Sequence, residues 1–291
     1  MSKTLEATIL SLVAETHIHV GTGQSAGALD LPVARERATS YPFVPGSGVK
    51  GALRVWSGEK AQFGQSAIDR LFGPKGAGGA DAGDDLQAGN LLVSDARLLL
   101  LPVRSLTDAF KWVTCPALLD RFWRDMRRAG LEGLPALPSI SVESGTYLGA
   151  ATRDATIGLE EREFSHGGDI PADTLDFLKT HVLQAAAGFV DRRLILLSDD
   201  NFTFFARYAL PVMTRNVLGD DKISSNLWHE ESLAPDTVLY LLLGERRADA
   251  VSLLRAAIGK QPYIQMGGNE TIGQGWFRAA FVTGPAGGSN A

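Results

Sequence analysis

The sequence predicts an α+β domain, because strand and helix patterns interleave along the chain with long insertions between them. Residues 4–13 alternate apolar and polar side chains, which is typical of a strand. After residue 47, apolar residues recur at helical spacing. Residues 263–282 predict a strand, a glycine-rich loop and a second strand. No internal repeat is visible, and this irregular order favours α+β over a doubly wound sheet.

In the N-terminal part, the first strand leads into a loop and then a helix. Residues 21–46 are rich in Gly and Pro and predict an extended loop. The helix is expected to begin near Ser47, a suitable N-cap residue. Its apolar stripe predicts a core-facing side formed by Val49, Ala52, Leu53 and Trp56. Residues 73–90 predict a flexible insertion, and residues 90–103 a strand pair or one long bent strand.

The middle of the chain is less regular. Residues 105–129 predict a helix with a break at Pro116, where Thr114 is a candidate cap. Residues 130–170 lack periodicity and predict an irregular insertion. The remaining predicted elements are a strand at 192–199, a helix at 201–210 capped by Asp200, strands at 210–243 around a polar turn, and a helix at 248–258 ended by Gly259.

Composition limits the class of protein. The chain has 291 residues, 45% hydrophobic and 21% charged, as expected of a globular protein with an ample core. Its net charge of −5 means that any polyanion site is a local patch. The single cysteine, Cys115, excludes an internal disulfide, and its apolar neighbours indicate a buried, inert thiol. No signal-peptide pattern or membrane-spanning run is present, so the sequence predicts a cytoplasmic protein without a membrane partner.

Basic residues gather near the start of the predicted helix. Lys50 and Arg54 are four residues apart in its first turns, where free backbone N–H groups and Ser47 favour an anion. Arg35 and Arg37 add charge upstream. Such a pair alone is more often a solvated helix face, but the surrounding glycines allow close approach of a backbone. The glycine context therefore favours an anion-binding role for these cations over a solvated face.

Glycine loops raise a second question. Residues 21–27 miss the dinucleotide fingerprint by one residue, and residues 46–52 lack the ending of a P-loop, so neither predicts a nucleotide site. The C-terminal loop contains Gly267, Gly268 and Gln274. It is either a long hairpin turn or a backbone surface on which a phosphodiester chain lies.

A lone carboxylate, Asp30, lies between two leucines after the first glycine-rich loop. The default interpretation of a single acid in such a loop is a turn-capping or solubilising residue. His19, eleven residues earlier, is either a general acid or base or a packed histidine at the end of a strand.

Blocks along nearly the whole chain resemble, in order, the RAMP proteins of CRISPR effector complexes. They include HVGTG, DLPVARE, YPFVPGSGVKGALR, LFG, VSDARLLLLPVRSLTDAFKWVTCPALLDRF, LSDDNFTFFARYALPVMTRN, LWHEESLAPDTVLY and GGNETIGQG. The chain most resembles the subunit that forms the repeated backbone of the type III-B (Cmr) complex. Residues 73–90 and 130–170 match least.

This resemblance implies one domain over residues 1–291: a modified RRM-like (ferredoxin-like) fold. It has a palm-like core, insertions at about 73–90 and 130–170, and a thumb-like hairpin at about 210–243. Subunits of this family stack along the CRISPR RNA with other type III-B subunits in antiviral defence. Each thumb displaces a base pair between guide and single-stranded target RNA.

The resemblance also implies that the Asp30 carboxylate promotes cleavage of the target. RNA supplies its own nucleophile, the 2′-hydroxyl, so we expect endonucleolysis that leaves a 2′,3′-cyclic phosphate and a 5′-hydroxyl. A divalent cation, Mg or Mn, is the expected cofactor, with Asp30 as its ligand. His229 replaces a tyrosine common in its block, and Glu230 is a minor candidate. The alternatives are a non-catalytic RNA-binding subunit and a guide-processing endoribonuclease.

Overall fold

The structure is a computed structural model that describes residues 7–25, 27, 29–74, 88–131, 134, 139–149, 154–183, 187–219, 222–247 and 249–283. Its strands are β1 Ala7–Ala14, β2 Phe43–Val44, β3 Leu91–Val93, β4 Ala96–Arg104, β5 Phe110–Thr114, β6 Thr146–Gly149, β7 Thr156–Leu159, β8 Arg162–Asp169, β9 Leu194–Leu196, β10 Val212–Leu218, β11 Ser224–Glu231, β12 Val238–Glu245, β13 Tyr263–Gln265 and β14 Trp276–Phe281. Its helices are α1 Gly46–Glu59, α2 Gln65–Phe72, α3 Pro116–Arg128, α4 Ala172–Phe177, the π-helix Leu178–Val182, α5 Ala187–Arg193, α6 Asp199–Tyr208, α7 Ala250–Lys260 and the 3₁₀ turn Glu270–Ile272.

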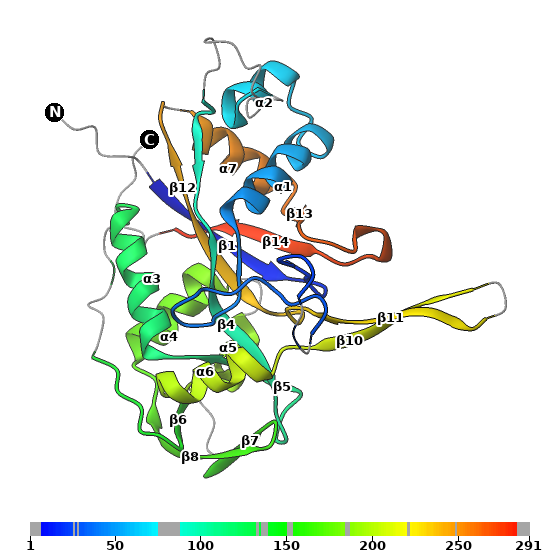
Figure 1. The fold of residues 1–291 in the computed structure, drawn as a ribbon. Helices are drawn as coiled ribbons and strands as arrows, with labels where there is room; N and C mark the ends of the chain where they lie inside the picture. Colours follow the sequence, from blue (N-terminus) through cyan, green and yellow to red (C-terminus); the bar gives the residue numbers. More distant parts are fainter. Residues whose placement is uncertain are drawn as a thin grey trace.

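One large mixed sheet organises the fold, in the order β13-β14-β1-β12-β4-β5-β9-β6-β8-β7 (Figure 1). At its centre β1 pairs antiparallel with both β12 and β14, and β12 pairs antiparallel with β4. Side chains alternate between the two faces of these strands. Leu10 and Leu12 share a core with α1 and α7, whereas Ile9 shares a second core with α3. The predicted strand at 4–13 is thus confirmed over its described residues.

Helix α1 carries the predicted apolar stripe, because Val49, Leu53 and Trp56 are buried. Its start differs from the prediction: Pro45 occupies the N-cap, and Ser47 is already inside the helix. Pro45 provides no side-chain cap, and the Gly46 amide instead donates to Oδ1 of Asp95, at 2.7 Å. A carboxylate from a neighbouring loop therefore already neutralises part of the positive end of this helix.

Between residues 105 and 170 the sequence predictions were partly wrong. Residues 110–114 form β5 rather than helix, and α3 begins after Cys115 instead of a Thr114 cap. The supposedly irregular segment 130–170 contains β6, β7 and β8. These short strands gain their hydrogen bonds from partners far along the chain, such as β9, which local periodicity does not reveal.

Later boundaries also shifted. Ser198, not Asp200, caps α6 and accepts from the Asn201 amide. Gly259 lies inside α7 instead of following it. The insertion predicted at 73–90 falls largely outside the described residues. The segment 90–103, predicted as a strand pair or one long bent strand, forms β3 and β4, which both pair with β12, as an interrupted single strand would.

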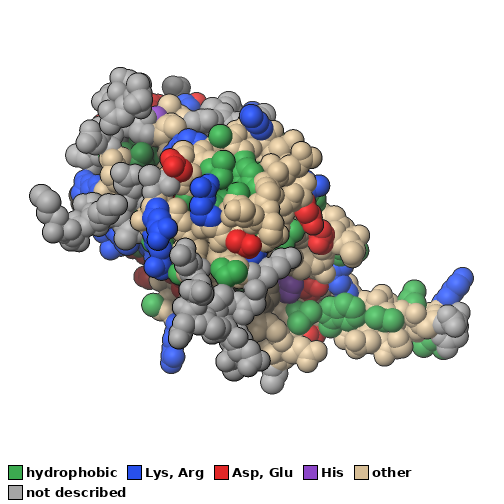
Figure 2. Space-filling view, turned by 90° about the horizontal axis from the view of Figure 1, so that it is seen from above, with side chains coloured by type: hydrophobic (Ala, Val, Ile, Leu, Met, Phe, Trp, Pro, Cys, Tyr) green, Lys and Arg blue, Asp and Glu red, His purple; other side chains and the backbone are tan. Residues whose placement is uncertain are grey.

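Strands β10 and β11 form a separate two-stranded hairpin that projects from the body (Figure 1). It is shorter than the predicted 210–243, because β12 belongs to the main sheet. A band of hydrophobic side chains runs along the arm (Figure 2). The exposed large hydrophobics on it are Val212, Val217, Leu218, Ile223 and Leu227. Among the described residues, no helix has the length and apolarity needed to cross a membrane.

Candidate RNA-cleavage site at the base of the hairpin

The loop that carries Asp30 is attached to the inner end of β11. The Leu31 amide donates to the His229 carbonyl at 3.1 Å, and the Glu231 amide donates to the Leu31 carbonyl at 3.0 Å. Leu31 and Glu230 form a parallel bridge. The loop thus continues the hairpin as a short extra strand, and its position depends on that of the arm.

Asp30 is held by the same contact but keeps part of its carboxylate available. Oδ2 accepts a hydrogen bond from the His229 amide at 2.7 Å and lies 3.5 Å from His229 Nδ1. This backbone hydrogen bond lowers the pKa of Asp30 from its ordinary value, so the group is ionised at neutral pH. Its side chain is 50% exposed. Because this hydrogen bond uses Oδ2, the other oxygen, Oδ1, can still accept a hydrogen bond from a ligand or bind a cation.

A hollow of about 370 Å³ lies between this loop and β11. Its lining combines polar side chains with apolar ones: Gln24, Ser25, Asp30, Leu31, Asn226, Leu227 and Trp228. Amide and hydroxyl groups beside an indole ring suit a nucleotide, which presents hydrogen-bonding edges and a flat face. Asp30 therefore lies in the wall of a hollow whose lining is chemically compatible with a nucleotide.

His19 is packed against the same end of β11. Its Nδ1 lies 2.7 Å from the Glu231 carbonyl, which requires Nδ1 to be the donor, and the side chain is 12% exposed. On its other side, the Gly268 amide donates to the His19 carbonyl at 2.9 Å. Gly267 has φ of +92°, and a Cβ there would lie 2.5 Å from that carbonyl oxygen. This is the packed arrangement left open by the sequence; a part for His19 in proton transfer stays a prediction.

Two consecutive carboxylates at the end of β11 point to opposite sides, as successive strand residues do. Glu230 is 3% exposed and accepts from Arg215 Nε at 3.1 Å. It also accepts from the Asn269 amide, whose nitrogen donates to Gln274 Oε1 at 3.0 Å. Glu230 thereby ties the arm to the C-terminal glycine loop.

Glu231 fixes the segment that follows Asp30. It is also 3% exposed, and accepts from the Val33 amide at 3.0 Å and from Arg35 Nη2 at 2.5 Å. Arg35 Nη1 donates in addition to the carbonyls of Ser40 and Ala206. In this structure the Arg35 guanidinium serves internal contacts.

The predicted RNA-binding cations fall into two groups. Arg54 is engaged like Arg35: it donates to Asp69 Oδ1 at 2.9 Å and to the Gly73 carbonyl. Lys50 is half-buried on α1, and Arg37 is exposed. No ion pair of either is present among the described residues. Lys50 and Arg37 are thus the better placed of the four to meet a phosphate, although RNA binding stays a prediction for all of them.

The predicted helix and the glycine loop face one another across a groove of about 400 Å³. Gly48 and Gly51 of α1 line one side, and Gly267 lines the other. The structure therefore brings Asp30, His19, Gly267, Gly268 and Gln274 to the base of the arm. Ser47, Lys50 and Arg54 lie on the neighbouring helix.

Sequence reasoning missed His229, Asn269, Arg215 and Glu231 as parts of this site. His229 matters through its backbone amide, which any residue other than proline supplies. Asn269 has φ of +65°, and its position in a glycine loop concealed its side-chain role. The adjacent acids Glu230 and Glu231 were the one available signal, because a strand end with two buried acids requires partners on both faces.

Comparisons with known proteins identify the family of this chain. Residues 11–278 match the family model of the RAMP superfamily. The chain is 30% identical over 293 residues to the CRISPR system Cmr endoribonuclease Cmr4 of Pyrococcus furiosus, covering 94% of this chain and 95% of that one.

Solved structures show the same fold. The crystal structure of oligomeric Cmr4 from Pyrococcus furiosus superposes with a TM-score of 0.72 at 24% identity, over 95% of this chain and 97% of that one. A chain of the type III-B Cmr-beta complex bound to cognate target RNA, solved by cryo-electron microscopy, gives 0.74 at 19% identity, over 94% and 96%. With a family match over most of its length and a relative of this similarity, the chain belongs to the RAMP superfamily.

Proposed function

We propose that this protein is a CRISPR RNA-binding backbone subunit of a type III-B effector complex and that it cleaves guide-paired target RNA. The observation that carries the proposal is the ionised, half-exposed Asp30 in the wall of the hollow beside the hairpin. Membership of the RAMP superfamily and similarity to a Cmr endoribonuclease support it. Its partners are CRISPR RNA, target RNA, further copies of itself and the other subunits of the complex, in the cytoplasm.

The finer fold assignment belongs to the same proposal. The central strands run in the order β14-β1-β12-β4, all antiparallel, with α1 and α7 packed on one face. The chain order is strand, helix, strand, strand, helix, strand, which is the ferredoxin-like arrangement of RRM domains. The β10–β11 arm is the thumb, and its exposed apolar side chains suit insertion between stacked bases.

In the proposed mechanism the protein supplies position and charge. The hollow holds a target nucleotide, so that the 2′-hydroxyl is aligned with the adjacent phosphorus, and the reaction is an intramolecular transesterification. The hydrogen bond from His229 keeps Asp30 anionic and fixes its direction. His19, locked by the Glu231 carbonyl, orients the neighbouring glycine loop.

A divalent cation at this site would have Asp30 as its protein ligand. Among the described residues, no group of three or more His, Cys, Asp and Glu side chains is placed to hold a metal. Asp30 alone would hold Mg²⁺ or Mn²⁺, and water and phosphate oxygens would complete its shell, as Mg²⁺ commonly accepts. The ion would neutralise charge on the phosphate.

The decisive experiment compares Asp30→Asn with Asp30→Ala in a reconstituted complex. Asparagine keeps an acceptor oxygen for the His229 amide but loses the charge, whereas alanine loses both. We expect both variants to reduce target cleavage to background and to assemble on the guide normally. Asp200→Asn, an exposed acid on α6, is the matched control and should cut like wild type.

The rival function is a non-catalytic RNA-binding subunit, and a specific contact favours it: Asp30 also anchors its loop to β11. Under that alternative Asp30→Asn cuts as fast as the wild-type complex, because the anchor survives. Removal of metal with EDTA followed by Mg²⁺ or Mn²⁺ tests the cofactor. Cleavage that persists in EDTA would exclude the divalent ion.

A further inference from the structure

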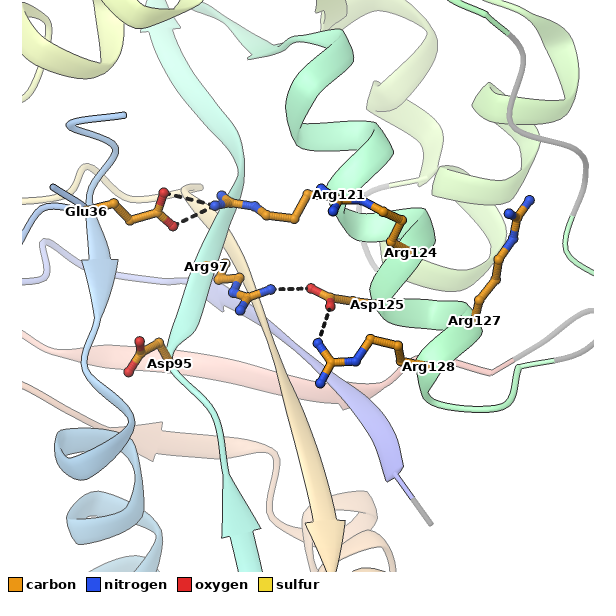
Figure 3. A pocket seen from close by; sticks show the side chains of 8 residues that line it. All are labelled: Glu36, Asp95, Arg97, Arg121, Arg124, Asp125, Arg127 and Arg128. Atoms are coloured by element: carbon orange, nitrogen blue, oxygen red, sulfur yellow. Dashed lines mark hydrogen bonds and ion pairs between the residues drawn. The ribbon is translucent and has the colours of Figure 1, made fainter. Parts of the chain in front are cut away.

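A second concave site lies away from Asp30, between α3 and the start of β4 (Figure 3). Its volume is about 720 Å³, and every residue that lines it is charged. The lining residues are Glu36, Asp95, Arg97, Arg121, Arg124, Asp125, Arg127 and Arg128. We call this site the arginine pocket. A lining made of charged side chains favours a charged occupant.

The carboxylates of the arginine pocket are already bonded within the protein. Asp125, 3% exposed, accepts from Arg97 at 2.6 Å and from the Tyr240 hydroxyl at 2.9 Å. Glu36 accepts twice from Arg121, at 2.7 and 2.9 Å, as Figure 3 shows. Asp95 accepts from the amide at the start of α1. These acids therefore stabilise the walls and leave the surplus charge of the pocket positive.

Unused capacity in the arginine pocket consists of donors. Arg121 Nη2 is buried and has no hydrogen-bond partner among the described residues. Arg127 is exposed at the rim, as is Arg124, whose Nε forms an ion pair with Asp120 at 3.0 Å, and Arg128 makes a 3.4 Å contact with Asp125. A guanidinium carries five N–H donors and no acceptor. A ligand of the arginine pocket would therefore bind through acceptor oxygens.

The shape favours a chain of anions over a single ion. Arg121, Arg124 and Arg128 are spaced i, i+3 and i+7 along one face of α3, which extends over about 10 Å. Asp95 joins this face to the N-terminus of α1, the helix expected to meet RNA. Planar guanidinium groups match phosphate geometry better than ammonium groups do. The arginine pocket therefore adjoins the N-terminus of α1.

We infer that the arginine pocket binds successive phosphates of an RNA backbone, an inference that rests on the proposed function. Two of the cations that the sequence predicts to bind RNA, Arg35 and Arg54, are bonded to carboxylates within the protein. In a chain with net charge −5, the arginine pocket gathers five arginines against three acids. It is the local basic patch that an acidic RNA-binding body requires.

The test measures binding of a single-stranded RNA oligonucleotide to the full chain over a series of salt concentrations. The variant is Arg124→Ala with Arg127→Ala, two rim positions whose loss leaves the bonded walls intact. Each lost phosphate contact lowers the slope of log affinity against log salt by about 0.7 for a single strand, so the double variant should lower it by about 1.4. The matched control is Arg246→Ala with Arg247→Ala, an exposed pair before α7 with the same charge loss.

Arg124→Lys with Arg127→Lys keeps both charges and should restore most of the slope, which separates binding from misfolding. An unchanged slope in the alanine variant overturns the inference. If self-association, followed by sedimentation, weakens while the slope stays constant, the pocket instead takes an acidic segment of another subunit, and the inference is wrong. Failure of the wild-type chain to bind RNA at all would remove the proposed function, whereas cleavage defects of Asp30 variants leave this result unaffected.

Discussion

Asp30 and the Glu230–Glu231 pair lie at the same end of β11, yet their surroundings differ. Asp30 is half exposed, and a single backbone amide holds one of its oxygens. Glu230 and Glu231 are each 3% exposed and bonded to an arginine and to a further donor. A carboxylate with an unbonded oxygen can accept a hydrogen bond from a ligand or bind a cation. A carboxylate whose oxygens already accept hydrogen bonds within the protein instead holds neighbouring segments in place. Neighbouring acids thus differ in whether they keep an oxygen available for a ligand.

The largest effect that tests this difference is on stability. Glu231→Ala leaves the positive charge of Arg35 without its carboxylate partner. It also removes the acceptor of the Val33 amide. We expect the free energy of unfolding, measured by urea titration, to fall by about 3 kcal/mol. Glu231→Gln keeps the hydrogen bond to Val33 and should lose less. A loss below about 1 kcal/mol in the alanine variant would contradict a role for Glu231 in holding these segments in place.

A smaller effect is expected at Glu230. Glu230→Gln keeps an acceptor for Asn269 but weakens the bond from Arg215, at a cost of about 1–2 kcal/mol. Because the Arg215–Glu230 bond joins the two strands of the arm, amide hydrogen exchange should quicken in β10 more than in β1. The exposed Glu163→Gln on β8 is the control and should exchange like wild type. Uniform quickening over the whole protein would point to general destabilisation instead.

The pH dependence of stability gives a still smaller effect. Burial lowers the pKa of His17 from its ordinary value of 6.5. The unfolded chain therefore takes up a proton near pH 6.5 before the folded chain does, so stability is full above that pH and falls as pH drops below it. Burial acts on His181 in the same direction. The difference in unfolding free energy between pH 7.5 and 5.5 should shrink in His17→Gln; an identical difference would remove His17 from the cause.

The smallest expected effect concerns the chemical reactivity of the buried thiol of Cys115. Cys115 is fully buried, and burial raises the pKa of its thiol to about 12. Iodoacetamide should therefore label the unfolded chain but leave the folded protein unmodified at pH 8. Mass spectrometry of both states measures this. Labelling of the native protein would show that its core opens on the time scale of the reaction.

Much of the fold could be predicted because its signals are local. The alternation in β1, the stripe of α1 and the glycine loop before β14 each lie within a single element. Strand β5 was mistaken for helix because its identity comes from pairing with β4 and with β9, about eighty residues away. Pairing of that kind leaves no periodic trace in a run of five residues.

The site shows the same limit. Sequence pattern and resemblance singled out Asp30 and His19, but not what surrounds them. The bond from His229 to Asp30 joins residues 199 positions apart, and the bond from Arg35 to Glu231 joins residues 196 apart. Helical spacing likewise placed Arg54 on a basic face without revealing that Asp69 of α2 would engage it. Which cations stay available is decided by tertiary contacts alone.

The projecting arm has a practical consequence for the isolated subunit. Leu218 and Ile223 near its tip are 57% and 67% exposed. Beyond the bridge from Leu31 to the base of β11, no described strand pairs with the outer edges of β10 and β11. Uncovered strand edges and apolar side chains on a narrow protrusion promote association with any similar surface. A preparation of the lone chain should therefore precipitate sooner than one that carries arm substitutions such as Ile223→Lys, and storage concentration will matter most before its RNA and neighbouring subunits are added.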